Sequence, residues 1–291
     1  MTSEEANREG AALFDAEDYT TWCRQLYRHV PRDGSAHVLF DSTMSEPTEL
    51  LRVTVARAFG DGVTDRFVSV FGQGNTYLID ALARRYNVDP RQVVSATGAT
   101  NAISMALRIL PPGRRRVLVE TPRLDLLHHL PAALGIEVTE FTRRAPAFDI
   151  DPDDLARAIR NDVGMVILTN PHNPSGAILS RERLKDIAEI AAQAGALVLV
   201  DEVYSDLAAD AGFAGAVHIA PNMIGVNSLS KSLGLFALRC GWLFAEPGLA
   251  RKIELANARI EFGISKLSHA IGALVLEDMR TFFDTYWRKV L

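Results

Sequence analysis

From about residue 92 onward, short apolar runs alternate with segments in which apolar residues recur at helical spacing. The runs are apolar on both faces, which is typical of strands in a central parallel sheet that helices cover on each side. We expect strands near Val94 and at residues 116–120, 135–141, 163–169, 196–200 and 223–226.

Two of the intervening segments carry clear helix-start signals. Asp151 can cap a helix whose first residue is Pro152. Ser180 can cap a second helix, in which Leu184 and Ile187 belong to one buried stripe. Strand, helix and strand in repeated order predict an α/β three-layer sandwich with a mostly parallel central sheet.

The two ends of the chain follow this pattern less closely. Residues 1–50 contain an amphipathic stretch at 19–27 and a looser segment at 31–47. From Leu249 to the end the pattern is helical, and residues 281–291 still have helical spacing.

Composition and charge narrow the functional classes. The 31 basic and 36 acidic residues give a net charge of −5, and the basic run at residues 114–116 is typical of a solvated loop, so nucleic-acid binding is not expected. Cys23 and Cys240 share no metal or redox spacing, and we expect two buried thiols in a reducing compartment. The acidic N-terminus does not have the pattern of a signal peptide, and no membrane-spanning apolar run is present. A soluble cytoplasmic protein without a metal site is expected.

Ligands of open α/β sheets bind beyond the carboxyl ends of the strands, so the residues after each strand are the candidates for chemistry. After the strand near Val94, residues 96–101 form a Gly-led turn at a helix start. Such a turn offers backbone N–H groups and the positive end of the helix dipole to a phosphate. Glycine at this place can also serve backbone geometry alone.

Two further strands end in polar segments. Residues 170–176 read Asn-Pro-His-Asn-Pro-Ser-Gly, in which two prolines flank Asn173 and hold its side chain in one place; a rigid turn is the alternative. Asp201 follows the strand at 196–200, and Tyr204 comes three residues later. A carboxylate at the end of an apolar strand needs a cationic or hydrogen-bonding partner, or else caps a helix.

The last predicted strand is followed by a lysine in unusual surroundings. Residues 227–234 read Asn-Ser-Leu-Ser-Lys-Ser-Leu-Gly, so Lys231 is flanked by hydroxyl-bearing and apolar residues. Arg239 follows eight residues later, in the sequence Arg-Cys-Gly. Lysine side chains are mostly exposed, so these neighbours favour a functional role.

Together these four segments resemble one family. The order Asn-Pro-x-Asn-Pro-Ser-Gly, Asp-x-x-Tyr, Ser-x-Ser-Lys and Arg-x-Gly is similar to that of the class I/II aminotransferases, which are fold-type I enzymes dependent on pyridoxal 5'-phosphate (PLP). The resemblance covers roughly residues 65–280, and four ordered motifs make it highly specific. It implies PLP as the cofactor, an amino acid and a keto acid as substrates, and a homodimer.

The resemblance also implies a role for each matched residue. Lys231 would hold the cofactor through an imine and later move the α-proton of the substrate. Asp201 would keep the ring nitrogen protonated, while Asn173 and Tyr204 would donate to the ring oxygen. The cofactor phosphate would be bound by Gly98, Ala99, Thr100, Ser228, Ser230 and Arg239.

Two residues depart from the pattern of the family. Relatives usually stack an aromatic side chain on the PLP ring two residues after a proline, whereas this chain has Leu124 after Pro122. An aliphatic side chain can cover the ring but changes its electronics. Phe71 lies where relatives commonly have a Tyr that reaches the neighbouring subunit's phosphate, and a phenyl ring cannot donate that hydrogen bond.

The family continues into a small C-terminal domain that supplies an Arg for the substrate carboxylate, whereas this chain ends at Leu291. We therefore expect an N-terminal segment with the arm and part of the small domain at 1–50, a PLP-binding large domain at 51–248, and an interdomain helix region at 249–291. The small domain is apparently missing: either the chain is truncated or the carboxylate is bound in another way.

Three functions are compatible with these features. The leading hypothesis is an aminotransferase that moves an amino group between an amino acid and a 2-keto acid through Lys231. A PLP-dependent lyase, decarboxylase or cyclase is the alternative within enzymes, and Leu124 favours it modestly. The third is a truncated PLP-binding protein without turnover.

Overall fold

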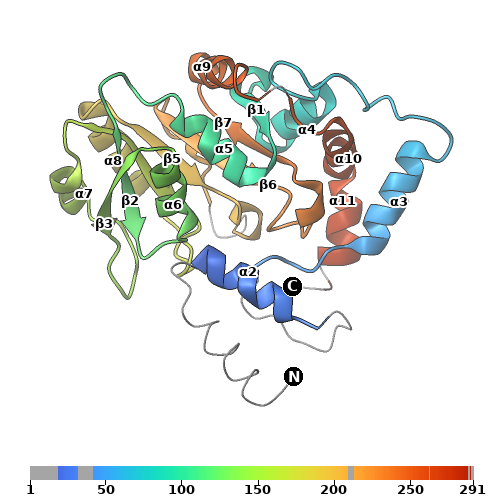
Figure 1. Cartoon of the computed structure of the whole chain (residues 1–291), viewed down its shortest axis with the longest axis horizontal. Helices are drawn as coiled ribbons and strands as arrows, with labels where there is room; N and C mark the ends of the chain where they lie inside the picture. Colours follow the sequence, from blue (N-terminus) through green and yellow to red (C-terminus); the bar gives the residue numbers. More distant parts are fainter. Residues whose placement is uncertain (1–18, 32–41, 209–212, 262, 288, 290–291) are drawn as a thin grey trace.

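The computed structural model describes residues 19–31, 42–208, 213–261, 263–287 and 289. It is a three-layer α/β structure in which one central sheet lies between two sets of helices (Figure 1). This is the predicted fold class.

The sheet has seven strands in the order β1-β7-β6-β5-β4-β2-β3. The pairs β2–β3, β2–β4, β4–β5 and β5–β6 are parallel, whereas β7 runs antiparallel to both of its neighbours, β1 and β6. The bounds are β1 Val93–Ala96, β2 Arg116–Thr121, β3 Glu137–Thr142, β4 Val163–Thr169, β5 Leu197–Asp201, β6 Met223–Ser228 and β7 Gly241–Phe244.

One face of the sheet is covered by α5 (Gly98–Leu107), α6 (Leu126–Ala133) and α9 (Pro247–Asn257). Their apolar side chains pack on alternate residues of the strands, as Ile103 of α5 and Ile253 of α9 do in the core that contains Val119 and Ile167. The central strands are buried on both sides, so these residues are removed from water almost completely.

The other face is covered in two parts. At the β3 end lie α7 (Pro152–Ala158) and α8 (Arg181–Gln193), whose side chains form a core with β2, β4 and β5. At the β1 end lie α4 (Thr76–Tyr86), α10 (Lys266–Glu277) and the short α11 (Met279–Phe282), which pack around Trp242 and Phe244 of β7.

Two helices lie before the sheet in the sequence. The helix α2 (Tyr19–His29) agrees with the predicted amphipathic stretch, and the N–H of Tyr19 donates to the Asp125 carboxylate at 3.2 Å. The helix α3 (Thr48–Phe59) packs against α10. The division at residues 50 and 248 stays a prediction.

Short helical turns connect the main elements. They are η1 Pro90–Gln92, η2 Ser205–Leu207, η4 Ala216–His218, η5 Phe236–Leu238 and the π-turn η6 Phe283–Trp287.

The predicted strands and caps are confirmed, with ends shifted by one or two residues. The Asp151 side chain accepts from the N–H groups of Asp153 and Asp154, and the Ser180 hydroxyl accepts from that of Arg183. These bonds satisfy N–H groups that have no partner inside the helix.

The strand β7 was not anticipated, and three expectations were wrong in part. The strand β3 was expected to be apolar on both faces, but of its residues only Phe141 is buried; it is one of the two edge strands and has β2 as its single neighbour. The helical C-terminal region is interrupted between α9 and α10. Cys240 is buried as expected. Cys23 is only half-buried, because it lies on the amphipathic helix α2, one side of which faces solvent.

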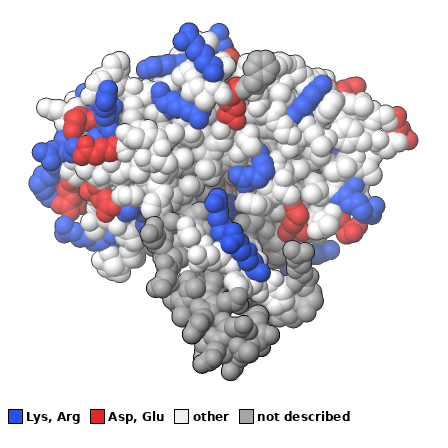
Figure 2. All heavy atoms as spheres, in the orientation of Figure 1, with Lys and Arg blue, Asp and Glu red and all other residues white. Residues whose placement is uncertain are grey.

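Charged side chains of both signs are spread over the surface. At both sides of the face in Figure 2, basic and acidic side chains lie next to one another. Many of them are paired, as Arg66 is with Glu277 at 3.0 Å and Arg183 with Asp149 at 2.9 Å.

Candidate active site

The sheet brings the predicted residues to one edge. Thr169 of β4 lies opposite Asp201 of β5, and Gly241 of β7 lies opposite both Ser228 of β6 and Ala96 of β1. Because β1, β4, β5 and β6 are parallel, the segments that follow them all leave the sheet on the same side.

Asp201 ends β5 and is 5 % exposed. Its Oδ1 atom accepts a hydrogen bond from the N–H of Val203 at 3.2 Å. Burial raises the pKa of Asp201 to about 6, while the Val203 hydrogen bond and the charge of Lys231 lower it. A carboxyl group in this environment favours a cationic partner, which would restore its ionisation.

Lys231 and Tyr204 meet at one serine. The Tyr204 hydroxyl donates to Ser42 Oγ at 2.9 Å, and Lys231 Nζ donates to the same oxygen at 3.3 Å. Lys231 Nζ also donates to Thr43 Oγ1 at 3.2 Å. The sequence predicted Lys231 and Tyr204 for the site but gave no role to Ser42 or Thr43.

The start of α5 forms a cradle with Arg239. Gly98 has a φ of +80°, and a Cβ atom at this position would lie 2.7 Å from Nη2 of Arg239. A Cβ atom at Gly241 would lie 2.5 Å from the backbone of Gly98. The Arg239 guanidinium also stacks on the Phe236 ring, 4.7 Å from its centroid. A guanidinium is thereby placed beside the first N–H groups of α5, which is a suitable arrangement for a phosphate.

Two serines lie at the end of β6: Ser228 is its last residue, and Ser230 follows two residues later. Ser228 is buried, and its hydroxyl accepts from the N–H of Ser230 at 3.3 Å. The Ser230 hydroxyl is buried too, and within the described part of the chain it has no hydrogen-bond partner. A buried hydroxyl without a partner is costly, and an anion bound at this place would supply an acceptor. The donor set therefore fits the phosphate of PLP.

Asn173 is held by the residue that ends β4. Its N–H donates to Thr169 Oγ1 at 3.0 Å. The same loop is tied to Asp201, because the N–H of Asn170 donates to the Asp201 carbonyl at 3.0 Å. The structure thus places the Asn-Pro segment beside the backbone of Asp201.

A buried ion pair under this loop was not predicted. Glu120, the residue before the last one of β2, is fully buried, and its Oε2 accepts from Arg143 Nη1 at 2.9 Å. Its Oε1 accepts from both the N–H and the hydroxyl of Thr169 at 2.6 Å. Burial raises the pKa of Glu120 to about 7, against the opposing attraction of Arg143. Charged residues at the ends of two adjacent predicted strands were the sequence signal for this pair.

The sequence also singled out Thr100, Leu124 and Phe71. Thr100 is half-buried in the first turn of α5. Leu124 is half-buried. Its segment contacts the Asn-Pro loop through Pro122, whose carbonyl oxygen lies 2.9 Å from His172 Nε2. Phe71 is 65 % exposed, in the segment before α4.

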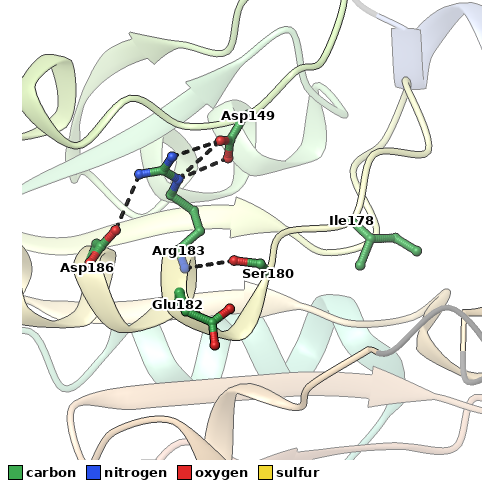
Figure 3. A pocket seen from close by; sticks show the side chains of 6 residues that line it. All are labelled: Asp149, Ile178, Ser180, Glu182, Arg183 and Asp186. Carbon is green, nitrogen blue, oxygen red and sulfur yellow. Dashed lines mark hydrogen bonds and ion pairs between the residues drawn. The ribbon is translucent and has the colours of Figure 1, made fainter.

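A surface pocket of about 250 Å³ lies elsewhere, at the start of α8 (Figure 3). Arg183 points toward Asp149 and Asp186 and pairs with both, at 2.9 and 3.3 Å. The pocket contains none of the predicted site residues, and the only basic side chain among the described residues that line it, Arg183, is already paired with two of its carboxylates. We therefore place the candidate active site at the strand ends and not here. The pocket is lined by Asp149, Ile178, Ser180, Glu182, Arg183 and Asp186.

Within the described ranges, no group of three or more His, Cys, Asp or Glu side chains is arranged to hold a metal ion. No helix in the described part is both long and apolar enough to cross a membrane.

Comparison with protein families gives one match over most of the chain. The model described as "Aminotransferase class I and II" matches residues 61–283. A histidinol-phosphate aminotransferase of Oleidesulfovibrio alaskensis is 30 % identical over 209 residues, which are 70 % of this chain and 54 % of that protein. The chain thus spans about half the length of this relative.

A relative with a different name aligns over more of the chain. The capreomycidine synthase of Streptomyces vinaceus is 26 % identical over 273 residues, which are 92 % of this chain and 69 % of that protein.

Solved structures agree with the fold. Aspartate aminotransferase from Thermus thermophilus with maleate has a TM-score of 0.79 at 20 % identity, and the match covers 96 % of this chain and 74 % of that one. N-succinyldiaminopimelate aminotransferase from Mycobacterium tuberculosis has a TM-score of 0.69 at 26 % identity, with 84 % and 66 % covered.

Proposed function

The chain belongs to the aminotransferase class I and II family, and from this membership we propose that it is a PLP-dependent aminotransferase. It would move an amino group between an amino acid and a 2-keto acid. The observation that carries the proposal is the meeting of Asp201, Lys231 and the Gly98–Arg239 cradle at one edge of the sheet.

Each residue would hold a different part of the cofactor. Lys231 would bind it covalently, and Asp201 would pair with its ring nitrogen. Asn173 and Tyr204 would donate to its ring oxygen, and Leu124 would cover the ring. Its phosphate would lie against Gly98, Ala99, Thr100, Ser228, Ser230 and Arg239.

When bound, PLP withdraws electrons from the α-carbon of an amino acid, which makes the bonds to that carbon easier to break. Asp201 would supply the negative charge that keeps the ring nitrogen protonated. Once a substrate amine takes its place, Lys231 would carry the α-proton as a general acid and base through Nζ. The Tyr204 hydroxyl would orient the ring oxygen during this transfer.

A reaction other than transamination is the second candidate. The relative that aligns with 92 % of this chain is named a synthase, and Leu124 stands where an aromatic side chain is expected. A PLP-dependent lyase, decarboxylase or cyclase would use the same residues. The homodimer and the cytoplasmic location stay predictions.

The test is the reaction of the purified, cofactor-loaded protein with a panel of amino acids. Conversion of the cofactor to its amine form with release of a keto acid supports the aminotransferase. Release of carbon dioxide or ammonia supports the second candidate. An unchanged absorbance spectrum with every amino acid contradicts both and leaves a PLP-binding protein without turnover.

Asp201→Asn tests the role of the carboxylate. We expect turnover to fall on the order of a hundredfold or more, whereas cofactor content after dialysis stays close to that of the unchanged protein. Asp186→Asn, on the exposed side of α8, is the control and leaves turnover unchanged. Near-normal turnover of Asp201→Asn would show that this carboxylate does not act on the ring nitrogen.

A further inference from the structure

The Lys231 amine contacts two hydroxyl groups from a distant part of the chain. Ser42 and Thr43 precede α3, and their side-chain oxygens accept from Lys231 Nζ at 3.3 and 3.2 Å. Ser42 Oγ also accepts from the Tyr204 hydroxyl at 2.9 Å. Ser42 thus binds both Lys231 and Tyr204, and Thr43 binds Lys231, although neither residue belongs to the family motifs.

The segment that carries these hydroxyls is anchored on the lysine loop by its backbone. The N–H of Met44 donates to the carbonyl of Lys231 at 3.4 Å. Gly234 has a φ of +68°, and a Cβ atom there would lie 2.4 Å from the Ser45 carbonyl oxygen. The Tyr286 hydroxyl donates to the same carbonyl. These contacts hold the segment and the loop together independently of the two hydroxyls.

We propose, on the basis of the proposed function, that Ser42 and Thr43 are positioning residues that orient the Lys231 amine for condensation with the cofactor aldehyde, in which nitrogen bonds to the carbonyl carbon and the carbonyl oxygen leaves as water with the two amine hydrogens. A neutral primary amine has two N–H donors and one lone pair. When the two N–H groups donate to the two hydroxyl oxygens, the lone pair points away from both of them. Nucleophilic attack requires that lone pair to be directed at the carbonyl carbon.

The same hydroxyls act again after the substrate has displaced the lysine. The long side chain then has many rotamers, and each ordered side chain of this kind changes a rate or affinity by about 2-fold to 10-fold. Acceptors on Ser42 and Thr43 keep Nζ within the site while it carries a proton. Among the described residues, Asp201 interacts electrostatically with Lys231 and Tyr204 shares the Ser42 acceptor with it, and both stay unchanged in every variant below.

The experiment measures capture of PLP by full-length protein from which the cofactor has been removed. The rate follows from the visible absorbance of the product over a range of pH, and borohydride reduction with mass spectrometry confirms attachment at Lys231. The double variant Ser42→Ala/Thr43→Val should capture PLP about 5-fold more slowly at the alkaline plateau. Its pH midpoint should also move down, because the charged amine loses two acceptors.

Two controls separate orientation from general damage. Ser42→Thr/Thr43→Ser keeps both hydroxyls and should restore the rate to within about 2-fold, which a merely structural role would not require. Ser45→Ala removes an exposed hydroxyl from the same segment and should capture PLP at the normal rate. If the double variant does not fold by circular dichroism, Thr43→Val alone is measured, with an expected loss of about 2-fold to 3-fold.

The possible outcomes distinguish this inference from the proposed function. An unchanged rate and pH midpoint in the hydroxyl-free variant overturn the role of Ser42 and Thr43 and leave the proposed function intact. An equal loss in the hydroxyl-retaining variant also overturns it, because the hydroxyls are then not the cause. Failure of the unchanged protein to capture PLP at Lys231 overturns both.

Discussion

Replacement of Arg143 by Met should destabilise the protein in a way that depends on pH. Arg143 is 1 % exposed and Glu120 is fully buried, and the two are joined at 2.9 Å. Removal of one partner of a buried ion pair costs about 3–5 kcal/mol, because the other charge is left buried without compensation. Methionine has a similar length and keeps the apolar part of the packing.

The pH dependence follows from the pKa of Glu120, which burial raises from 4.5 to about 7. When folding raises the pKa of a carboxyl group, the contribution of that group to stability is greatest at a pH below its pKa in the unfolded chain. The contribution is lost as the pH rises through its pKa in the folded protein. One pKa unit corresponds to about 1.4 kcal/mol, so this group alone lowers stability by about 3 kcal/mol between pH 4.5 and pH 7. Arg143 lowers the pKa of Glu120, and its loss moves the folded value further up.

The unfolding free energies of the unchanged protein and of Arg143→Met should therefore diverge above pH 7. Below pH 6 Glu120 is mostly protonated in both folded proteins, and the difference in unfolding free energy is the cost of the lost Arg143 hydrogen bonds. Above pH 7 the difference should widen by up to about 1.4 kcal/mol per pH unit. Urea unfolding followed by the fluorescence of the buried Trp242 and Trp287, with PLP in equal excess, measures it at each pH.

Two controls complete this test. The double variant Arg143→Met/Glu120→Gln has no ionisable carboxyl at this position. Its difference in unfolding free energy from the unchanged protein should therefore not widen above pH 7. Arg52→Met breaks the exposed pair with Glu49 and should change stability by less than about 1 kcal/mol. A gap for Arg143→Met that is the same at pH 5 and pH 8 would refute the reasoning.

Two other substitutions test the cofactor site. Gly98→Ala should weaken PLP binding about tenfold in an absorbance titration, because its Cβ atom would meet the Arg239 guanidinium. Gly113→Ala is the control: Gly113 has a similar φ of +78° but open space around it. This variant has the same backbone strain and should leave the Kd for PLP unchanged. Equal affinities of the two variants would contradict the cradle. Thr169→Val removes the acceptor for the Asn173 N–H and should raise the Kd for PLP about fivefold. Thr139→Val is the control, because the Thr139 hydroxyl donates to a carbonyl of the neighbouring strand, and its Kd should not change. A normal Kd for Thr169→Val would show that Asn173 is held by other contacts.

The central strands and their following segments could be predicted because each signal is local. An apolar run of five to seven residues with Asp201 or Asn173 after it marks both a buried strand and its carboxyl end. Parallel strands then bring those ends together without further information. The positions of Asp201, Asn173 and Ser228 at one edge of the sheet therefore follow from the sequence pattern.

The remaining features depend on contacts between distant segments. The direction of β7 has no signature in its four residues, because a buried strand is apolar whichever way it runs. The bonds of Ser42 with Tyr204 and Lys231 span 162 and 189 residues, and neither serine nor threonine is unusual before a helix. Glu120 was visible as a polar strand end, but its partner Arg143 follows a different strand and is buried only through the packing of the loop at residues 144–149.

The place of β7 has a consequence for synthesis on the ribosome. Val93 of β1 pairs with Phe244 of β7, and β6 pairs with the opposite edge of the same strand. Until β7 has emerged, β1 has no neighbour in the sheet and β6 keeps an open edge, which is a template for pairing with other chains. Chaperones that cover exposed strand edges should therefore bind the nascent polypeptide until its last strand is released, and a stall before that point should favour aggregation.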